Sequence, residues 1–342
     1  MSKVAIVILN WNGSAMLQKF LPKLIEYSTA DGVEIIVADN SSTDNSLQVM
    51  KDNFPGIRTI VLDKNYGFAG GYNKALAQVE AEYYLLLNSD IEVTQGWLDP
   101  MLQYMDSHAH VAACQPKLMD YKDPAKFEYA GGSGGFMDRW GYMYCRGRVF
   151  DSIETDNGQY DDIVPVFWAT GASLLVRSAD FRAVGGLDDE FFAHQEEIDL
   201  CWRLRSRGRG IVVVPQSKVY HVGGATLSSS NPYKTFLNFR NNLLLLYKNL
   251  PEKELKKVMF VRFWLDMVAA AMFLLKLNTG DFKAVLRARR AFRRMKPGFA
   301  EKRAENISKM VTDTIPERSS FLLVWQYNVL GKRTFTALQG QE

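Results

Sequence analysis

Cysteine is scarce in this chain, and the few cysteines present exclude two classes of protein. Cys114, Cys145 and Cys201 are odd in number and far apart. They form neither a disulfide framework nor a zinc-binding spacing, so we expect a reducing compartment. We expect no secretory signal, because the apolar run at residues 4–9 is too short for one and suits a buried strand. We therefore expect a cytoplasmic protein.

Internal repeats are also absent, and the composition excludes a disordered or collagen-like chain. Hydrophobic residues make up 47% and charged residues 23%, which leaves enough apolar surface for a full core. A length of 342 residues suits about two domains of ~150 residues, or one large domain with an appendage. We expect a domain over residues 1–250 and a C-terminal helical region over residues 251–342.

Acidic residues are few in one part of the chain. Residues 251–310 carry 15 Lys and Arg against 6 Asp and Glu, whereas residues 1–250 carry 23 against 29. This asymmetry indicates an anionic partner for the C-terminal segment: nucleic acid, a phosphorylated ligand or a membrane surface. A solvated helix face is the alternative explanation.

Two C-terminal stretches have distinct patterns. Residues 258–275 are mostly apolar, but Arg262 and Asp266 are spaced to pair, which predicts a buried or interfacial helix rather than a membrane span. Residues 282–299 read as a basic amphipathic helix suited to anionic headgroups. A helix packed on the catalytic domain or a dimer contact would show the same pattern.

Strands and helices alternate along the first hundred residues. This order predicts an α/β fold with a parallel sheet and crossover helices, and the continuous apolar strands predict burial on both sheet faces. Residues 110–165 read as short strands joined by turns, and the chain after Pro251 reads as wholly helical. The predicted strands are 4–9, 33–38, 57–62, 83–87, 172–176 and 210–214; the predicted helices are 14–27, 44–53, 70–79 and 198–206.

Polar residues follow four predicted strands in succession. The runs are Asn10-Trp11-Asn12-Gly13, Asp39-Asn40-Ser41-Ser42, Asn65 to Asn73, and Asn88-Ser89-Asp90. Because ligands of open parallel sheets bind beyond the strand ends, these runs predict a polar crevice. Asp39 could accept from a nucleobase or a ribose hydroxyl, and Asp90 is placed to bind a divalent cation. The Gly67–Gly71 loop lacks the dinucleotide-binding spacing and suits close approach to a base or phosphate.

Three carboxylates crowd the start of another predicted helix. Glu196, Glu197 and Asp199 could simply complement the helix dipole, but like charges so close also raise a pKa, as a general base requires. His221 follows the strand predicted at residues 210–214, within the run from Tyr220 to Gly224. A lone histidine of this kind is more often structural than a ligand.

The order of these motifs over residues 3–250 resembles the family 2 glycosyltransferases, closest to a bacterial rhamnosyltransferase-like branch. The resemblance implies a GT-A fold: a mostly parallel central sheet with helices on both faces, here with a C-terminal helical extension. It implies that Asp39 binds the base, and that Asp90 is the last aspartate of a metal-binding DXD motif whose first position is Asn88. His221 would be a further metal ligand, and Glu197 or Glu196 the catalytic base. The implied nucleotide-binding residues are Asn10, Asn12, Asp39, Ser41, Asn65, Gly67, Phe68, Gly71, Asn73 and Ser89.

The resemblance also implies a reaction. A sugar would move with inversion from a UDP- or dTDP-linked donor, dTDP-rhamnose being one candidate, to a hydroxyl of a saccharide or lipid-linked acceptor in cell-surface polysaccharide synthesis. Mg²⁺ or Mn²⁺ would assist, and the enzyme could contact an anionic membrane at its inner face. No nucleic acid partner is implied, and a homo-oligomer is left open.

Two alternatives fit the sequence less well. A sugar-phosphate nucleotidyltransferase would usually show a Gly-rich, Lys- or Arg-bearing signature after the first strand, where this chain has Asn10-Trp11-Asn12-Gly13. A non-catalytic RNA-binding protein using the basic tail would leave the carboxylates at the strand ends without a role, and aromatic–basic interleaving is absent.

Overall fold

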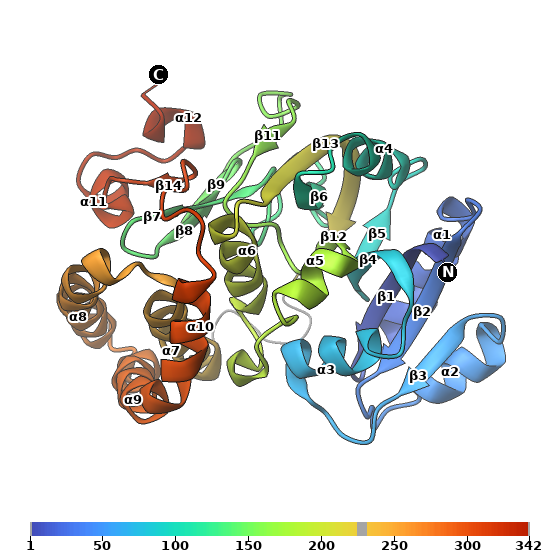
Figure 1. The fold of residues 1–342 in the computed structure, drawn as a ribbon, viewed down its shortest axis with the longest axis horizontal. Coiled ribbons are helices and arrows are strands. Elements are labelled where there is room, and N and C mark those ends of the chain that lie inside the picture. Colours follow the sequence, from blue (N-terminus) through green and yellow to red (C-terminus); the bar gives the residue numbers. More distant parts are fainter. Residues whose placement is uncertain (1, 224–230, 341–342) are drawn as a thin grey trace.

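A central mixed sheet organises the molecule, whose computed structural model describes residues 2–223 and 231–340. Its strand order is β11-β13-β6-β12-β4-β1-β2-β3, with β5 paired to β13 (Figure 1). Strands β1 to β4 pair in parallel, whereas β12 runs antiparallel between β4 and β6. The strands are β1 (Ser2–Asn10), β2 (Val33–Asp39), β3 (Arg58–Val61), β4 (Ala81–Asn88), β5 (Ile91–Val93), β6 (Val111–Asp120), β11 (Val164–Pro165), β12 (Ser173–Arg177) and β13 (Gly210–His221).

Helices cover both faces of this sheet, as predicted. In β1, Val4, Ile6 and Ile8 belong to one core cluster and Ala5 and Val7 to the other, so the strand is buried on both sides. The first cluster includes residues of α1 (Ser14–Tyr27), α2 (Ser46–Asn53) and α4 (Asp99–Ser107). The second includes residues of α3 (Gly67–Leu76), α5 (Ser178–Ala183), α6 (Glu196–Ser206) and α7 (Pro232–Asn249).

Most predicted elements of the first hundred residues lie within a few positions of the observed ones. The largest shift there is α3, which begins at Gly67 rather than residue 70, because the Asn65 side chain accepts from the Gly67 amide. Strand β13 was predicted to end at Val214, before Pro215. It instead resumes pairing with β6 after a register shift between Val214 and Lys218, so that His221 is its last residue.

A second, five-stranded sheet accounts for the stretch predicted as short strands and turns. Its order is β10 (Ser152–Ile153), β9 (Arg148–Val149), β8 (Met143–Cys145), β7 (Gly135–Asp138) and β14 (Arg318–Ser319). Strand β14 corrects the prediction that the chain after Pro251 is wholly helical. Ion pairs of Glu317 with Arg205 and of Arg318 with Glu254 fix this segment beside β7.

The C-terminal helices pack beside α7, at the left of Figure 1. They are α8 (Glu252–Leu275), α9 (Thr279–Met295), a 3₁₀ turn (Lys296–Phe299), α10 (Ala300–Ser308), α11 (Leu323–Asn328) and α12 (Phe335–Leu338). Val285 and Phe292 of α9 are buried, and α9 contacts both α7 and α8. At Val285 and Phe292 the apolar side of this basic helix therefore faces protein, as expected for a helix packed on the catalytic domain. The helix also ends at Met295, before Pro297.

Candidate active site

The predicted polar runs meet at one edge of the central sheet. Asn10 at the end of β1 is the register partner of Asp39 at the end of β2, and Leu9 is that of Asn88 at the end of β4. On the other side of β4, the Asn88 amide donates to the Ala172 carbonyl at 2.9 Å. The carboxyl ends of three parallel strands and the start of β12 thus form one row.

Asp39 is fixed at one end of this row. It is buried, and its carboxylate accepts from Asn10 Nδ2 at 3.1 Å and from the Ser42 amide at 2.8 Å, across the left-handed turn at Ser41 (φ 62°). Asn10 Oδ1 is also buried and has no hydrogen-bond partner within the described part of the chain. A Cβ at Gly13 would lie 2.4 Å from that oxygen. Because buried polar atoms are seldom left unpaired, the Asn10 oxygen is an unusual feature beside Asp39.

Several predicted nucleotide-binding amides are engaged within the protein. Asn12 Oδ1 accepts from the Thr43 amide at 2.7 Å. Asn65 Oδ1 accepts from Asn40 Nδ2 at 3.1 Å, and Asn40 had not been predicted as a site residue. Asn73 exchanges two bonds with the backbone of Leu187, at 2.7 and 3.0 Å. These side chains hold the loops around the row in place.

The glycine loop also packs against protein. A Cβ at Gly67 would lie 2.5 Å from the Phe192 ring, and one at Gly71 would lie 2.8 Å from Leu9. The Phe68 amide donates to the Phe192 carbonyl at 2.7 Å. Gly67 thus allows α3 to pack closely on the segment before α6, and Gly71 allows it to pack closely on β1.

Asp90 lies beside His221 near the middle of the row. Asp90 Oδ1 is 3.2 Å from His221 Nε2, and Glu128 Oε1 is 3.2 Å from His221 Nδ1. All three side chains are buried. Burial alone would lower the pKa of His221, but the two carboxylates raise it to about 10, and His221 in turn lowers the pKa of Asp90 against the effect of burial. Sequence reasoning missed Glu128, which lies in an irregular segment and belongs to no motif.

The Asp90–His221 pair fits a divalent cation in one respect. Histidines that bind metals usually present their other ring nitrogen to a carboxylate, as His221 does to Glu128. Residues 2–223 and 231–340 contain no group of three or more His, Cys, Asp or Glu side chains that could hold a metal ion. Two protein ligands leave positions for water and phosphate oxygens, as Mg²⁺ sites often do. Gly224, from the motif predicted around His221, lies outside the described residues.

The turn before α6 is strained and held in place. Phe192, His194 and Gln195 have φ of 66°, 70° and 71°, a left-handed conformation that costs energy in residues other than glycine. Asn241 Nδ2 of α7 lies within 3.0 Å of three carbonyl oxygens of this turn. The structure therefore fixes the direction in which the chain enters α6.

Glu197 lies on this first turn of α6, next to the row of strand ends. A Cβ at Gly171 would lie 3.5 Å from Glu197 Cβ and 3.2 Å from the Phe68 ring. Gly171 precedes Ala172, whose carbonyl binds Asn88, so the acidic helix start borders the same sheet edge as Asp90. Glu197 Oε2 has no hydrogen-bond partner within the described part of the chain.

The three carboxylates of α6 have different environments. Burial raises the pKa of Glu197 to about 7. Burial, and then the charge of Glu197, raise the pKa of Glu196 well above its usual value. Burial acts the same way on Asp199, but Arg203 and Lys248 outweigh it and lower the pKa of Asp199 to about 2. Repulsion was expected to set these values, whereas burial is the larger cause for the two glutamates.

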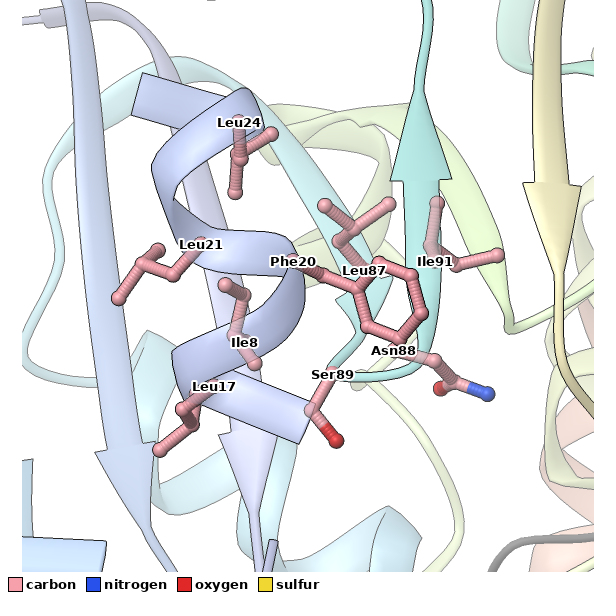
Figure 2. A pocket seen from close by; sticks show the side chains of 9 residues that line it. All are labelled: Ile8, Leu17, Phe20, Leu21, Leu24, Leu87, Asn88, Ser89 and Ile91. Carbon is pink, nitrogen blue, oxygen red and sulfur yellow. The ribbon is translucent and has the colours of Figure 1, made fainter. Parts of the chain in front are cut away.

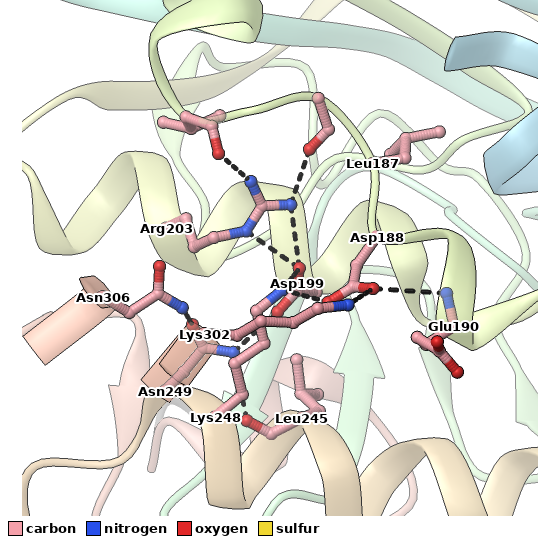
Figure 3. Close-up of polar contacts among 12 residues, drawn as sticks. Leu187, Asp188, Glu190, Asp199, Arg203, Leu245, Lys248, Asn249, Lys302 and Asn306 are labelled. Carbon is pink, nitrogen blue, oxygen red and sulfur yellow. Dashed lines mark hydrogen bonds and ion pairs between the residues drawn. The ribbon is translucent and has the colours of Figure 1, made fainter. Parts of the chain in front are cut away.

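Asp199 belongs to a buried ion-pair network instead (Figure 3). Lys248 Nζ of α7 donates to Asp199 at 2.8 Å and to Asp188 at 2.6 Å, and Arg203 Nε donates to Asp199 at 2.9 Å. Lys302 of α10 donates to the other oxygen of Asp188 at 2.6 Å. This network joins α6 to α7 and α10 and so anchors the helix that carries Glu197.

A small hollow under α1 borders the row but is not the ligand site. Its volume is about 10 Å³, room for about one water molecule. Apolar side chains such as Leu17, Phe20 and Ile91 line it, with Asn88 and Ser89 at its edge (Figure 2). Its size and lining exclude a nucleotide.

Solved structures share this fold. A mannosyltransferase from Pyrobaculum calidifontis, in complex with GDP-Man and Mn²⁺, superposes with a TM-score of 0.52 at 14% identity, covering 91% of this chain and 86% of that one. Staphylococcus aureus TarS (residues 1–349) superposes with a TM-score of 0.52 at 17% identity, covering 90% and 88%. The fold is thus the GT-A fold expected from the motifs.

Sequence comparison matches part of the chain to one family. The model of glycosyl transferase family 2 matches residues 5–158. An N-acetylglucosaminyl-diphospho-decaprenol L-rhamnosyltransferase of Mycobacterium tuberculosis is 27% identical over 241 residues, 63% of this chain and 75% of its own length. The rhamnosyltransferase WbbL of Escherichia coli K12 is 27% identical over 215 residues, 60% and 79%. Residues 5–158 thus match glycosyl transferase family 2, and rhamnosyltransferases are among the relatives of the chain, as the resemblance of its motifs implied.

Proposed function

We propose that the protein transfers a sugar, with inversion, from a UDP- or dTDP-linked donor to a hydroxyl group. The observation that carries this proposal is the alignment of Asp39, Asp90 and Glu197 along one sheet edge. The rhamnosyltransferase relatives favour dTDP-rhamnose as the donor. Residues 1–250 would form the catalytic domain, with residues 251–342 as its helical extension.

Different site residues would have different roles in the transfer. Asp39 and the unpaired Asn10 oxygen would bind the base and ribose of the donor. Glu197 would accept the proton of the acceptor hydroxyl as its oxygen bonds to the anomeric carbon, while the bond from that carbon to the diphosphate oxygen breaks on the opposite face. Asp90 and His221 would hold a divalent cation, Mg²⁺ or Mn²⁺, which neutralises negative charge on the diphosphate.

The acceptor is proposed from the relatives. The name of the mycobacterial relative identifies a lipid-linked sugar diphosphate as its acceptor. We therefore propose a saccharide or lipid-linked acceptor in cell-surface polysaccharide synthesis, used by an enzyme in the cytoplasm at the inner face of the membrane. A homo-oligomer is left open.

A nucleotide screen by thermal denaturation tests the donor site. UDP or dTDP with Mn²⁺ should raise the Tm of the wild type, since a ligand that binds only the folded state stabilises it by about 2.7 kcal/mol at 100 times its Kd. The same nucleotide without metal should raise it less, because the diphosphate charge is then unneutralised.

The Asp90→Asn variant should lose most of the metal-dependent shift. Asp52→Asn, which changes an exposed carboxylate on α2, is the matched control and should keep it. Equal shifts with and without metal, or a full shift in Asp90→Asn, would contradict the proposed metal ligand.

A further inference from the structure

Helix α8 presents a continuous apolar stripe to solvent. Phe260, Trp264, Val268, Met272 and Leu275 follow one another at intervals of four, four, four and three residues, which places them on one side of a helix. Their exposed fractions are 65, 57, 56, 49 and 83%. We call these five residues the α8 stripe. Isolated exposed apolar residues are ordinary, but a row of this length marks an interaction surface.

The opposite side of α8 is tied to the protein by charged groups. Arg262 and Asp266 are buried and pair at 2.8 Å, as their spacing predicted, and Arg289 of α9 also pairs with Asp266. Arg262 Nη1 donates to the Trp140 carbonyl at 3.0 Å. Within the described residues, α8 is the one helix long and apolar enough to cross a membrane. Only 22% of its most apolar 18-residue stretch is buried in the protein. Because one side is joined to the protein, the helix suits a position in the membrane surface plane rather than across it.

The helix that carries the stripe and the helix that follows it are rich in positive charge. Residues 253–296 contain 12 Lys and Arg and three acidic residues, Glu254, Asp266 and Asp281. Asp266 and Asp281 are buried, and Glu254 pairs with Arg318. The cations are largely exposed, among them Lys256, Lys257, Lys276, Lys283, Arg287, Arg290, Arg293 and Arg294.

We propose that the α8 stripe binds the surface of an anionic lipid bilayer. The stripe enters the boundary between headgroups and acyl chains, and the exposed Lys and Arg of α8 and α9 bind the acidic headgroups. A second copy of the chain fits this surface less well, since it would bring an equally basic segment against the first. This proposal differs from the prediction that residues 282–299 bind headgroups as an amphipathic helix. Here the arginines of α9 contribute charge, while α8 supplies the apolar contact.

Vesicle co-sedimentation of the full chain, without donor or acceptor, tests the proposal independently of transfer activity. The wild type should bind vesicles of phosphatidylcholine with phosphatidylglycerol at least about tenfold more tightly than pure phosphatidylcholine, and high salt should weaken this binding. The Phe260→Ser, Trp264→Ser double variant should lose on the order of tenfold or more in partitioning, because two aromatic side chains no longer enter the bilayer.

Val61→Ser is the matched control, since Val61 on β3 is 59% exposed and lies outside the stripe. It should bind vesicles as the wild type does, and an unchanged Tm of the double variant establishes that it is folded. No vesicle binding by the wild type, or equal binding by the double variant, overturns the proposal. A dimer that the double variant converts to monomer, without any effect on vesicles, overturns it in favour of a second copy.

Discussion

Glu197→Gln should lower kcat by about three orders of magnitude, within the range of 10²–10⁴ that general bases contribute. Glutamine keeps the size of the side chain but cannot accept the acceptor's proton. The affinity for UDP or dTDP should stay near that of the wild type, because the nucleotide is proposed to bind at Asp39 and Asp90. Steady-state kinetics and calorimetric titration of the nucleotide measure the two quantities separately.

Glu196→Gln is the matched control and decides between the two adjacent glutamates. Glu196 is buried, whereas Glu197 is only partly buried and borders the sheet edge that carries Asp90. Substitution of Glu196 should leave most of the activity. Unchanged turnover in Glu197→Gln, or a larger loss in Glu196→Gln, would reject the assignment.

The pH dependence of wild-type activity tests the same role of Glu197. Burial raises the pKa of Glu197 to about 7, and a general base acts only when deprotonated. We therefore expect kcat to rise about tenfold per pH unit below pH 7 and to level off above it. A flat profile between pH 5 and 8 would contradict this role.

Lys248→Met should lower the free energy of unfolding by about 3–5 kcal/mol, the cost typical of removing one partner from a buried ion pair. The Lys248 ammonium lies between the carboxylates of Asp188 and Asp199, and all three side chains are buried. Methionine fills similar space but leaves Asp199 with less positive charge around it. Urea denaturation followed by circular dichroism measures the change.

Lys302→Met is the control, because Lys302 donates to the same Asp188 from a side chain that is 38% exposed. Exposed ion pairs contribute about 1 kcal/mol or less, so this variant should unfold close to the wild type. Equal losses in the two variants, or no loss in Lys248→Met, would show that the network does not anchor α6.

The sequence predicted the row of strand ends because that row depends on local periodicity. Alternating strands and helices indicate parallel strands, and parallel strands bring Asn10, Asp39 and Asn88 to one edge. Glu128 could not be found in this way. It reaches His221 from an irregular segment, 93 residues before it in the chain, and only tertiary packing brings the two together.

For Asp199 and α9, the sequence pattern predicted the local arrangement but not the partner. The spacing of Asp199 from Glu196 and Glu197 predicts proximity but not that Lys248, 49 residues later, neutralises it. The amphipathic pattern of α9 correctly identifies an apolar side, yet the same pattern serves a membrane or a neighbouring helix. Here Phe292 is buried in the protein core, while α8 carries the exposed apolar side.

A crystal structure with UDP or dTDP and Mn²⁺ bound tests the account most directly. The anomalous signal of manganese should lie between Asp90, His221 and the diphosphate, with the base against Asp39 and Glu197 open toward the sugar side. A nucleotide bound away from the ends of β1, β2 and β4, or manganese held by other side chains, would contradict the account.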